Sequence, residues 1–311
     1  MGYEVDFSSL DVCVENGRSD LTDQEALAEV KLVYAMWLKE SGSYDENAWR
    51  KLSFANKSKC NPEDNSNSAV VIFSDGTSGG QDISKFNEPK ISCERRNGSV
   101  SCKGTSLIMG FGGPGWITPY YYSPEKWIRL AKKAPSTTVF SPYVQWTSLK
   151  KDVMRSEDIS DSVKNKVTRE YDSLVADQSP AKLFAFAKLL EDQKILIGKD
   201  AGFQTAFQRF FDGTADEEET SFTPNVGVFH VLLHEVGHQF GMGHADNPQP
   251  DDVTGYAAGN EASASRNANG QWVTDKASMA YALTYTYLTA DDKAGIKSVG
   301  KTIRDQLTNK K

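Results

Sequence analysis

HEVGHQFGMGH, residues 234–244, holds three of the four histidines in this chain of 311 residues, and His230 lies just upstream. Apolar residues recur at helical spacing through the same region and predict a buried helix: Phe229, Leu232, Leu233 and Val236. Because residues i and i+4 share one face of a helix, His234 and His238 can point at one atom. Histidines that serve packing alone would not gather in this way, so the stretch predicts a metal site or a general base.

The ends of this helix are also predicted. Residues 223–225, Thr-Pro-Asn, provide a capping hydroxyl followed by a proline at the first helical position, so we expect the helix to begin there. Were the helix to continue past His238, six further residues would carry His244 about 9 Å along the axis. Gly241 can adopt the left-handed conformation that stops a helix. We therefore expect the chain to turn at Gly241 and to bring His244 back beside the other two histidines.

Three imidazoles that meet at one point are a ligand set for zinc. Catalytic zinc sites have three protein ligands and one exchangeable position, whereas structural sites are closed by four protein ligands. We expect one catalytic Zn²⁺ held by His234, His238 and His244. Glu235 follows the first ligand and would lie beside the exchangeable position. There it can act as the general base toward water and then pass the proton to the leaving amine.

The spacing H-E-x-x-H-x-x-G-x-x-H resembles the signature of the metzincin zinc peptidases. Further along, ASMAYA (277–282) is similar to their methionine turn, with Met279 as the methionine that lies beneath the metal. Tyr281 is similar to the tyrosine of astacins and serralysins that can join the metal, although simple core packing is an equal alternative. LTADDKAGI (288–296) resembles the helix start that follows this turn in matrix metalloproteinases. The resemblance covers about residues 230–300.

The resemblance implies an α+β fold with two lobes, a twisted mixed sheet, an active-site helix and an extended N-terminal region. The N-terminal lobe would span residues 1–244 and include an insertion. The C-terminal lobe, residues 245–311, would hold the methionine turn and a terminal helix. Ala245 matches none of the residues that usually follow the third histidine, so the subfamily stays open.

The implied function is that of a secreted zinc-dependent endopeptidase, whose extended protein or peptide substrate pairs with a sheet edge. Two other functions stay open: an exopeptidase or amidase that acts on small substrates, and a catalytically silent binding module. An intact Glu235 argues against the silent module, since a relic has no need of a base.

The composition of the chain limits the kinds of partner that the protein is expected to bind. Apolar residues make up 39% and charged residues 25% of the chain, as in an ordinary soluble globule. The net charge of −7 disfavours nucleic acid and anionic membranes, because both select for basic patches. No apolar run approaches the ~20 residues of a transmembrane helix. An inhibitor or a pro-segment stays open as a further partner. Calcium at the acidic runs 216–219 and 246–252 also stays open, although their spacing matches no calcium loop.

The four cysteines predict two disulfides. Cys93 and Cys102 flank Asn97-Gly98, a tight-turn signal, so a hairpin would bring their sulfur atoms together. Cys13 and Cys60 remain as the second pair. Two disulfides indicate an oxidising compartment, so we expect a secreted, extracellular or periplasmic protein whose export signal has been removed. The alternatives are four buried thiols in a cytosolic protein and, for Cys60 in KCNPED, a thiol that keeps the metal site latent.

The remaining pattern predicts helices and strands in a mixed order. A helix should begin at a capping box formed by Thr22 and Glu25 and end at Gly42. Near the C-terminus, Thr289 together with Asp292 should cap a last helix. The expected strands are 69–74, 105–111 and 136–143, with an irregular loop over 112–124 and helices between about 156 and 211.

His230 precedes His234 by four residues and shares its face of the helix, so its spacing alone is also that of a metal ligand. The residue after it is Val231 and not a glutamate. We therefore expect His230 to serve packing or hydrogen bonding behind the ligands, with contact to the substrate cleft as the alternative.

Overall fold

The structure is a computed structural model. It describes residues 11–42, 49, 52–60, 69–75, 91–96, 99–104, 110–114, 136–140, 145–156, 159–197, 219–222, 225–240, 242, 265–266, 272–273, 278, 285–290 and 292–297. For the described residues within 91–140, 219–226, 265–266 and 272–273, and for residue 145, it describes the backbone only.

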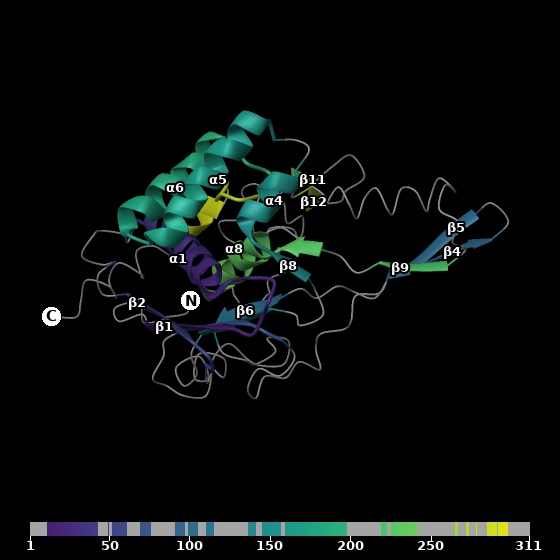
Figure 1. Cartoon of the computed structure of the whole chain (residues 1–311), viewed down its shortest axis with the longest axis horizontal. Coiled ribbons are helices and arrows are strands. Elements are labelled where there is room, and N and C mark those ends of the chain that lie inside the picture. The colour runs from purple at the N-terminus through teal and green to yellow at the C-terminus, as the bar shows by residue number, and fades with distance from the viewer. Residues whose placement is uncertain are drawn as a thin grey trace.

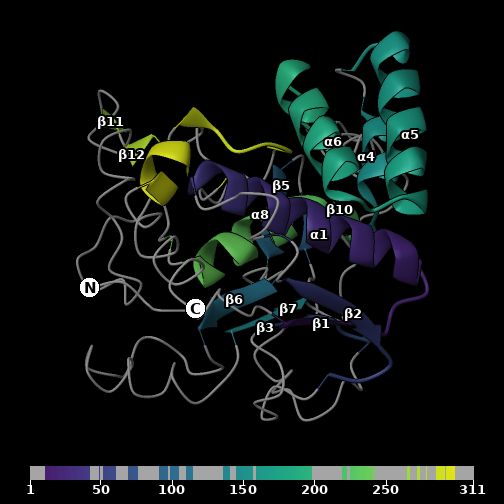
Figure 2. The same ribbon diagram turned by 90° about the vertical axis from the view of Figure 1, so that its left-hand side faces the viewer.

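A five-stranded mixed sheet forms the base of the described structure (Figures 1 and 2). Its strands stand in the order β2-β1-β3-β7-β6, and the first four are parallel to one another. β6 closes the row and runs antiparallel to β7. The strands are β1 (Asp11–Asn16), β2 (Ser53–Lys57), β3 (Ala69–Phe73), β6 (Gly110–Pro114) and β7 (Ser136–Phe140).

Both faces of β1 and β3 are buried, as expected for parallel strands covered on two sides. Alternate residues of β1 and β3 join the main hydrophobic core under the helices: Val12, Val14, Ala69, Val71 and Phe73. The residues between them point to the opposite face and are equally buried: Cys13, Val70 and Ile72.

Two helices lie on the core face of the sheet, α1 (Asp23–Glu40) and α8 (Val228–Gln239). α1 packs over β1 and β2, and α8 packs over β6 and β7, so that together they cover the width of the sheet. Beyond α1 lies an outer group of helices (Figure 2): α4 (Leu149–Arg155), α5 (Asp161–Ala176) and α6 (Pro180–Asp192). The histidine helix therefore packs against both the sheet and α1, and all its residues are buried.

The predicted caps of α1 are present. The hydroxyl oxygen of Thr22 accepts a hydrogen bond from the backbone N–H of Glu25, and the Glu25 carboxylate accepts one from the backbone N–H of Thr22. After the helix, Gly42 has φ of 70°, a left-handed conformation that glycine adopts without the steric cost of a Cβ. The capping box and this glycine thus set the two ends of α1, as the sequence predicted.

Two local predictions were wrong. Residues 112–114 were expected in a loop, but they belong to β6, because an edge strand accepts glycine and proline where only one side needs to pair. The histidine helix was expected to begin at residues 223–225, but Asn225–Gly227 forms β10, which pairs in parallel with β8 (Gln145–Thr147). α8 begins only at Val228. Long-range pairing overrode the local capping signal there.

A second sheet contains the predicted cysteine hairpin. β4 (Ile91–Arg96) pairs in antiparallel fashion with β5 (Ser99–Gly104) and with β9 (Glu219–Phe222). Figure 1 shows these three strands projecting from the rest of the molecule. The register places Cys93 directly opposite Cys102, a backbone arrangement that suits the predicted pair. A short antiparallel pair, β11 (Ser265–Arg266) with β12 (Trp272–Val273), completes the strands.

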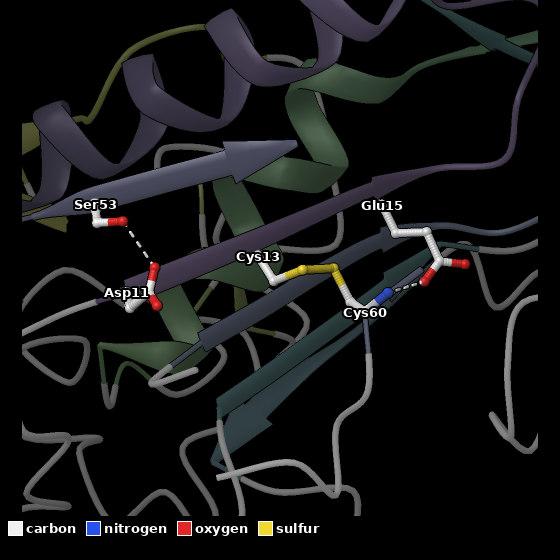
Figure 3. The surroundings of a disulfide bond; sticks show 5 residues. All are labelled: Asp11, Cys13, Glu15, Ser53 and Cys60. Atoms are coloured by element: carbon white, nitrogen blue, oxygen red, sulfur yellow. Dashed lines mark hydrogen bonds between the residues drawn. A yellow bond between two sulfur atoms is a disulfide. The ribbon is translucent and has the colours of Figure 1, made fainter. Parts of the chain in front are cut away.

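The other predicted disulfide, Cys13–Cys60, is present, with its Cα atoms 5.9 Å apart (Figure 3). It ties β1 to the chain beyond β2 on the face of the sheet opposite the helices. The carboxylate of Glu15 accepts a hydrogen bond from the backbone N–H of Cys60 at 2.6 Å and supports the same link. Because Cys60 is bonded to Cys13, it has no thiol to offer as a latency ligand.

A buried carboxyl group joins α1 to the outer helices. Glu29 of α1 accepts hydrogen bonds from the Tyr171 hydroxyl at 2.6 Å and from the backbone N–H of Leu149 at 2.8 Å. Burial raises the pKa of Glu29 to about 8, although these hydrogen bonds lower it. Glu29 therefore holds a proton at neutral pH and connects α1, α4 and α5.

Candidate metal centre

α1 holds the histidine helix in place. The indole N–H of Trp37 donates to the carbonyl oxygen of Leu233 at 3.1 Å, and the hydroxyl of Tyr34 donates to the side-chain oxygen of Gln239. Phe240, the first residue after α8, stacks on Trp37 with ring centroids 6.2 Å apart. Two directional hydrogen bonds and a stacked ring fix both the position and the rotation of α8.

His234 and His238 lie side by side on α8, one turn apart. Their ring centroids are 4.8 Å apart and their planes are inclined at 88°. Burial and, to a smaller extent, the neighbouring His238 lower the pKa of His234 to about 3. The imidazole of His234 is therefore neutral at pH 7, which is the form that binds a metal.

Each of these two rings donates a hydrogen bond from Nδ1 to a backbone carbonyl. His234 Nδ1 lies 3.1 Å from the carbonyl oxygen of Ser278, and His238 Nδ1 lies 2.7 Å from that of Met242. A carbonyl can only accept, so the proton is on Nδ1 and Nε2 carries the lone pair. Metal-binding histidines typically use their second nitrogen in this way. Both Nε2 atoms can therefore act as metal ligands.

The end of α8 supplies one of those carbonyls. The backbone N–H of Phe240 donates to the carbonyl oxygens of Val236 and Gly237, and that of Met242 donates to Gly237 at 3.0 Å. A bond that spans five residues is typical of the Schellman ending of a helix. The helix ends at Gln239 with Phe240 as its C-cap, just before Gly241. Met242 thus closes the helix with its N–H and orients His238 with its carbonyl oxygen.

Ser278 supplies the other carbonyl and is itself held by Asp292. The buried carboxylate of Asp292 accepts from the backbone N–H of Ser278 at 3.0 Å. It also accepts from the N–H and hydroxyl of Thr289, at 2.8 and 2.9 Å. This contact with Thr289 is the predicted capping pair, and residues 292–297 are helical after it. Asp292 therefore links the start of the last helix to the residue that orients His234.

Glu235 follows His234 on α8 and is 9% exposed. A carboxylate in that place can serve as a proton acceptor for a water molecule held near the histidine pair. His230, which shares the helix face of His234 but was not predicted to bind the metal, is buried. It donates from Nδ1 to the carbonyl oxygen of Tyr285 at 3.0 Å. This contact agrees with hydrogen bonding behind the ligands.

The other predicted site residues lie outside the described residues: His244, Gly241, Met279 and Tyr281. So do the side chains of Cys93 and Cys102 and the acidic run 246–252, and of the run 216–219 only the backbone of Glu219 is described. Within the described part of the chain, no group of three or more His, Cys, Asp or Glu side chains is placed to hold a metal. The described centre is therefore a pair of histidines, and the metal ligand set His234, His238 and His244 stays a prediction.

Comparisons with known proteins add no assignment: no family model, curated protein or solved structure matches the chain. Of the helices described, none is both long and apolar enough to cross a membrane.

Sequence reasoning missed the residues that orient the two histidine rings. Ser278 and Met242 act through backbone carbonyls, which every residue has, so residue identity carries no signal for them. Ser278 could have been suspected because it directly precedes Met279 in the predicted methionine turn. Gln239 and Tyr34 gave no signal, since their contact joins positions 205 residues apart.

Proposed function

We propose that this protein is a zinc-dependent endopeptidase of the metzincin type, in which His234, His238 and His244 hold the metal and Glu235 is the general base. One observation carries the proposal. Two histidines at i and i+4 on a buried helix both place Nδ1 on a backbone carbonyl, at 3.1 and 2.7 Å. In this tautomer both rings carry the Nε2 lone pair on one face of the helix, which is the arrangement that ligation of a single metal requires.

The donor set suits zinc. Imidazole nitrogen is among the preferred donors of this ion, and three such donors leave one position open. When bound, zinc makes water acidic enough to ionise near neutral pH and polarises a carbonyl group. The protein contributes the orientation of the histidines: the carbonyls of Ser278 and Met242 hold the rings of His234 and His238 before the metal binds. Less reorganisation is then needed when the metal binds.

Glu235 provides the proton transfers. Its carboxylate takes a proton from the attacking water and hands it to the nitrogen of the leaving amine, so that the carboxylate is regenerated in each cycle. Met279 would form the floor below the ligands, and Tyr281 would stabilise the transition state, as the resemblance implies.

The outer edge of the sheet is an argument for an extended peptide substrate. In the described part of the sheet, β6 pairs with β7 on one side only, and α8 packs against β6. An extended peptide that adds to the outer edge of β6 through backbone hydrogen bonds would lie alongside the histidine helix. This arrangement favours a protein or peptide substrate over a small amide. It is also compatible with the two-lobed α+β fold, with α8 as the active-site helix.

The Cys13–Cys60 disulfide supports an oxidising compartment. We therefore place the enzyme outside the cytosol, in a secreted, extracellular or periplasmic location.

The deciding experiment compares Glu235→Gln with wild type on peptides blocked at both ends. The variant should keep its zinc but lose about 10³-fold or more in kcat, because an amide cannot accept the proton. Glu170→Gln, a change on the surface of α5, is the matched control and should behave as wild type. Activity of Glu235→Gln within tenfold of wild type would refute the mechanism.

Two further outcomes decide between the alternatives. A wild-type protein that trims free ends but leaves blocked peptides intact is an exopeptidase. Zinc binding without cleavage of any member of a broad peptide library favours the silent binding module.

A further inference from the structure

His230 repeats, one turn earlier on α8, the contact that His234 makes. His234 donates from Nδ1 to Ser278 and His230 donates from Nδ1 to Tyr285, at 3.1 and 3.0 Å. The earlier residue of the helix, His230, contacts the later residue, Tyr285, and His234 contacts the earlier one, Ser278. Two parallel contacts thus bracket residues 278–285, the stretch that includes Met279 and Tyr281.

The ring of His230 is held firmly in this orientation. It is buried at the start of α8, where a Cβ on Gly227 would come within 3.0 Å of the ring and would collide with the Asp152 carboxylate. Burial lowers the pKa of His230 to about 4, so the ring is neutral. Its Nε2 has no hydrogen-bond partner among the described residues, which leaves Nδ1 as the polar contact of the ring there.

Tyr285 is tied down on its other side as well. It forms a β-bridge with Leu196, and the hydroxyl of its neighbour Thr286 donates to the carbonyl oxygen of Ile195 at 2.8 Å. His230 therefore connects α8 to a point on the segment that is already anchored to the end of the outer helices. The bond between His230 and Tyr285 therefore links α8 to the end of the outer helices.

We propose that His230 is a positioning residue: its bond to Tyr285 holds the stretch 285–290, in which Thr289 binds the same Asp292 carboxylate that holds Ser278, so that Ser278 stays in place to orient the predicted ligand His234. The inference deepens the proposed function and rests on it for the identity of the metal. His230 itself touches neither metal nor substrate.

Two amide substitutions separate this role from packing. The amide nitrogen of asparagine is bonded to Cγ, as Nδ1 is in histidine, whereas that of glutamine is one carbon further out and corresponds to Nε2. His230→Asn should therefore keep the bond to Tyr285, and His230→Gln should lose it. His230→Leu removes the donor altogether and keeps a bulky side chain at this buried position.

The measurements are hydrogen exchange of the backbone amides of Ser278 and of the segment 285–290, and the zinc dissociation constant of the full chain. Without the bond, in the Gln and Leu variants, exchange in this segment should become roughly tenfold faster. The zinc dissociation constant should rise up to about tenfold, since the support of a ligand is weakened. His230→Asn should stay within about twofold of wild type in both measurements.

A packing role predicts the opposite order, with leucine tolerated best and asparagine worst. That order, or equal behaviour of the Asn and Gln variants, would overturn the proposal. Neither measurement needs peptidase activity. If the wild type binds no zinc, the proposed function fails, while the exchange data still decide whether His230 holds the segment.

Discussion

Asp292 and Ser278 are joined by a buried hydrogen bond of 3.0 Å, from the backbone N–H of Ser278 to the carboxylate. The carbonyl oxygen of Ser278 in turn accepts from His234. Asp292 is not itself a predicted ligand. Its carboxylate holds the backbone of Ser278, and Ser278 in turn orients the predicted ligand His234. This relationship makes the last helix part of the candidate site.

We expect Asp292→Ala to weaken zinc binding by about 10–100-fold, the usual effect of removing a group that supports a metal ligand. Competition with a chelator measures the affinity. Asp292→Asn retains an acceptor oxygen, so its zinc affinity should lie between those of wild type and Asp292→Ala. Asp177→Asn removes a carboxylate from the C-cap of α5, far along the chain, and should have no effect on zinc. Equal zinc affinity in Asp292→Ala and wild type would show that Ser278 needs no such support.

Zinc should bind in a ratio of one per chain, and His238→Ala should lose most of it. Elemental analysis of the purified proteins measures the content directly. Glu170→Gln on the surface of α5 is the control and should keep full zinc occupancy, because it removes no ligand and no residue that supports one. Full occupancy in His238→Ala would exclude this ligand set.

Glu29 should make the protein less stable as the pH rises. Its pKa in the folded state is about 8, against an ordinary value of 4.5. The folded state therefore holds the proton more tightly than the unfolded chain. The stability from this group is full below about pH 4.5 and is lost as the pH rises toward 8, at no more than about 1.4 kcal/mol per pH unit.

Glu29→Gln should remove this slope, because the amide remains neutral and its oxygen can still accept from Tyr171 and Leu149. Urea unfolding between pH 5 and 8 gives the free energies, and Glu170→Gln is the surface control. A slope that is unchanged in Glu29→Gln would mean that other groups cause the pH dependence.

Peptide mapping without reduction should recover two bonded pairs, Cys13–Cys60 and Cys93–Cys102. Replacing Cys13 and Cys60 by alanine should lower the free energy of unfolding by about 2–4 kcal/mol, as the bond closes a loop between residues 47 apart. Alkylation of Cys93 and Cys102 in protein prepared under oxidising conditions would reject the second pair.

Features set by neighbouring residues were predictable from the chain. The capping box of Thr22 with Glu25 depends on residues three apart, and the pairing of His234 with His238 depends on residues four apart. The hairpin that opposes Cys93 to Cys102 follows from its turn. In each case the backbone geometry of a helix or a turn is enough to place the residues.

Features that join distant parts of the chain depended on the tertiary structure. Asn225 lies in a strand because β8 offers a partner, although the local pattern favours a helix start. Ser278 orients His234 across 44 residues, and Tyr34 holds Gln239 across 205. Glu29 keeps its proton because three helices enclose it. Backbone carbonyls, strand partners and burial are properties of the packed molecule, so helical or turn periodicity cannot encode them.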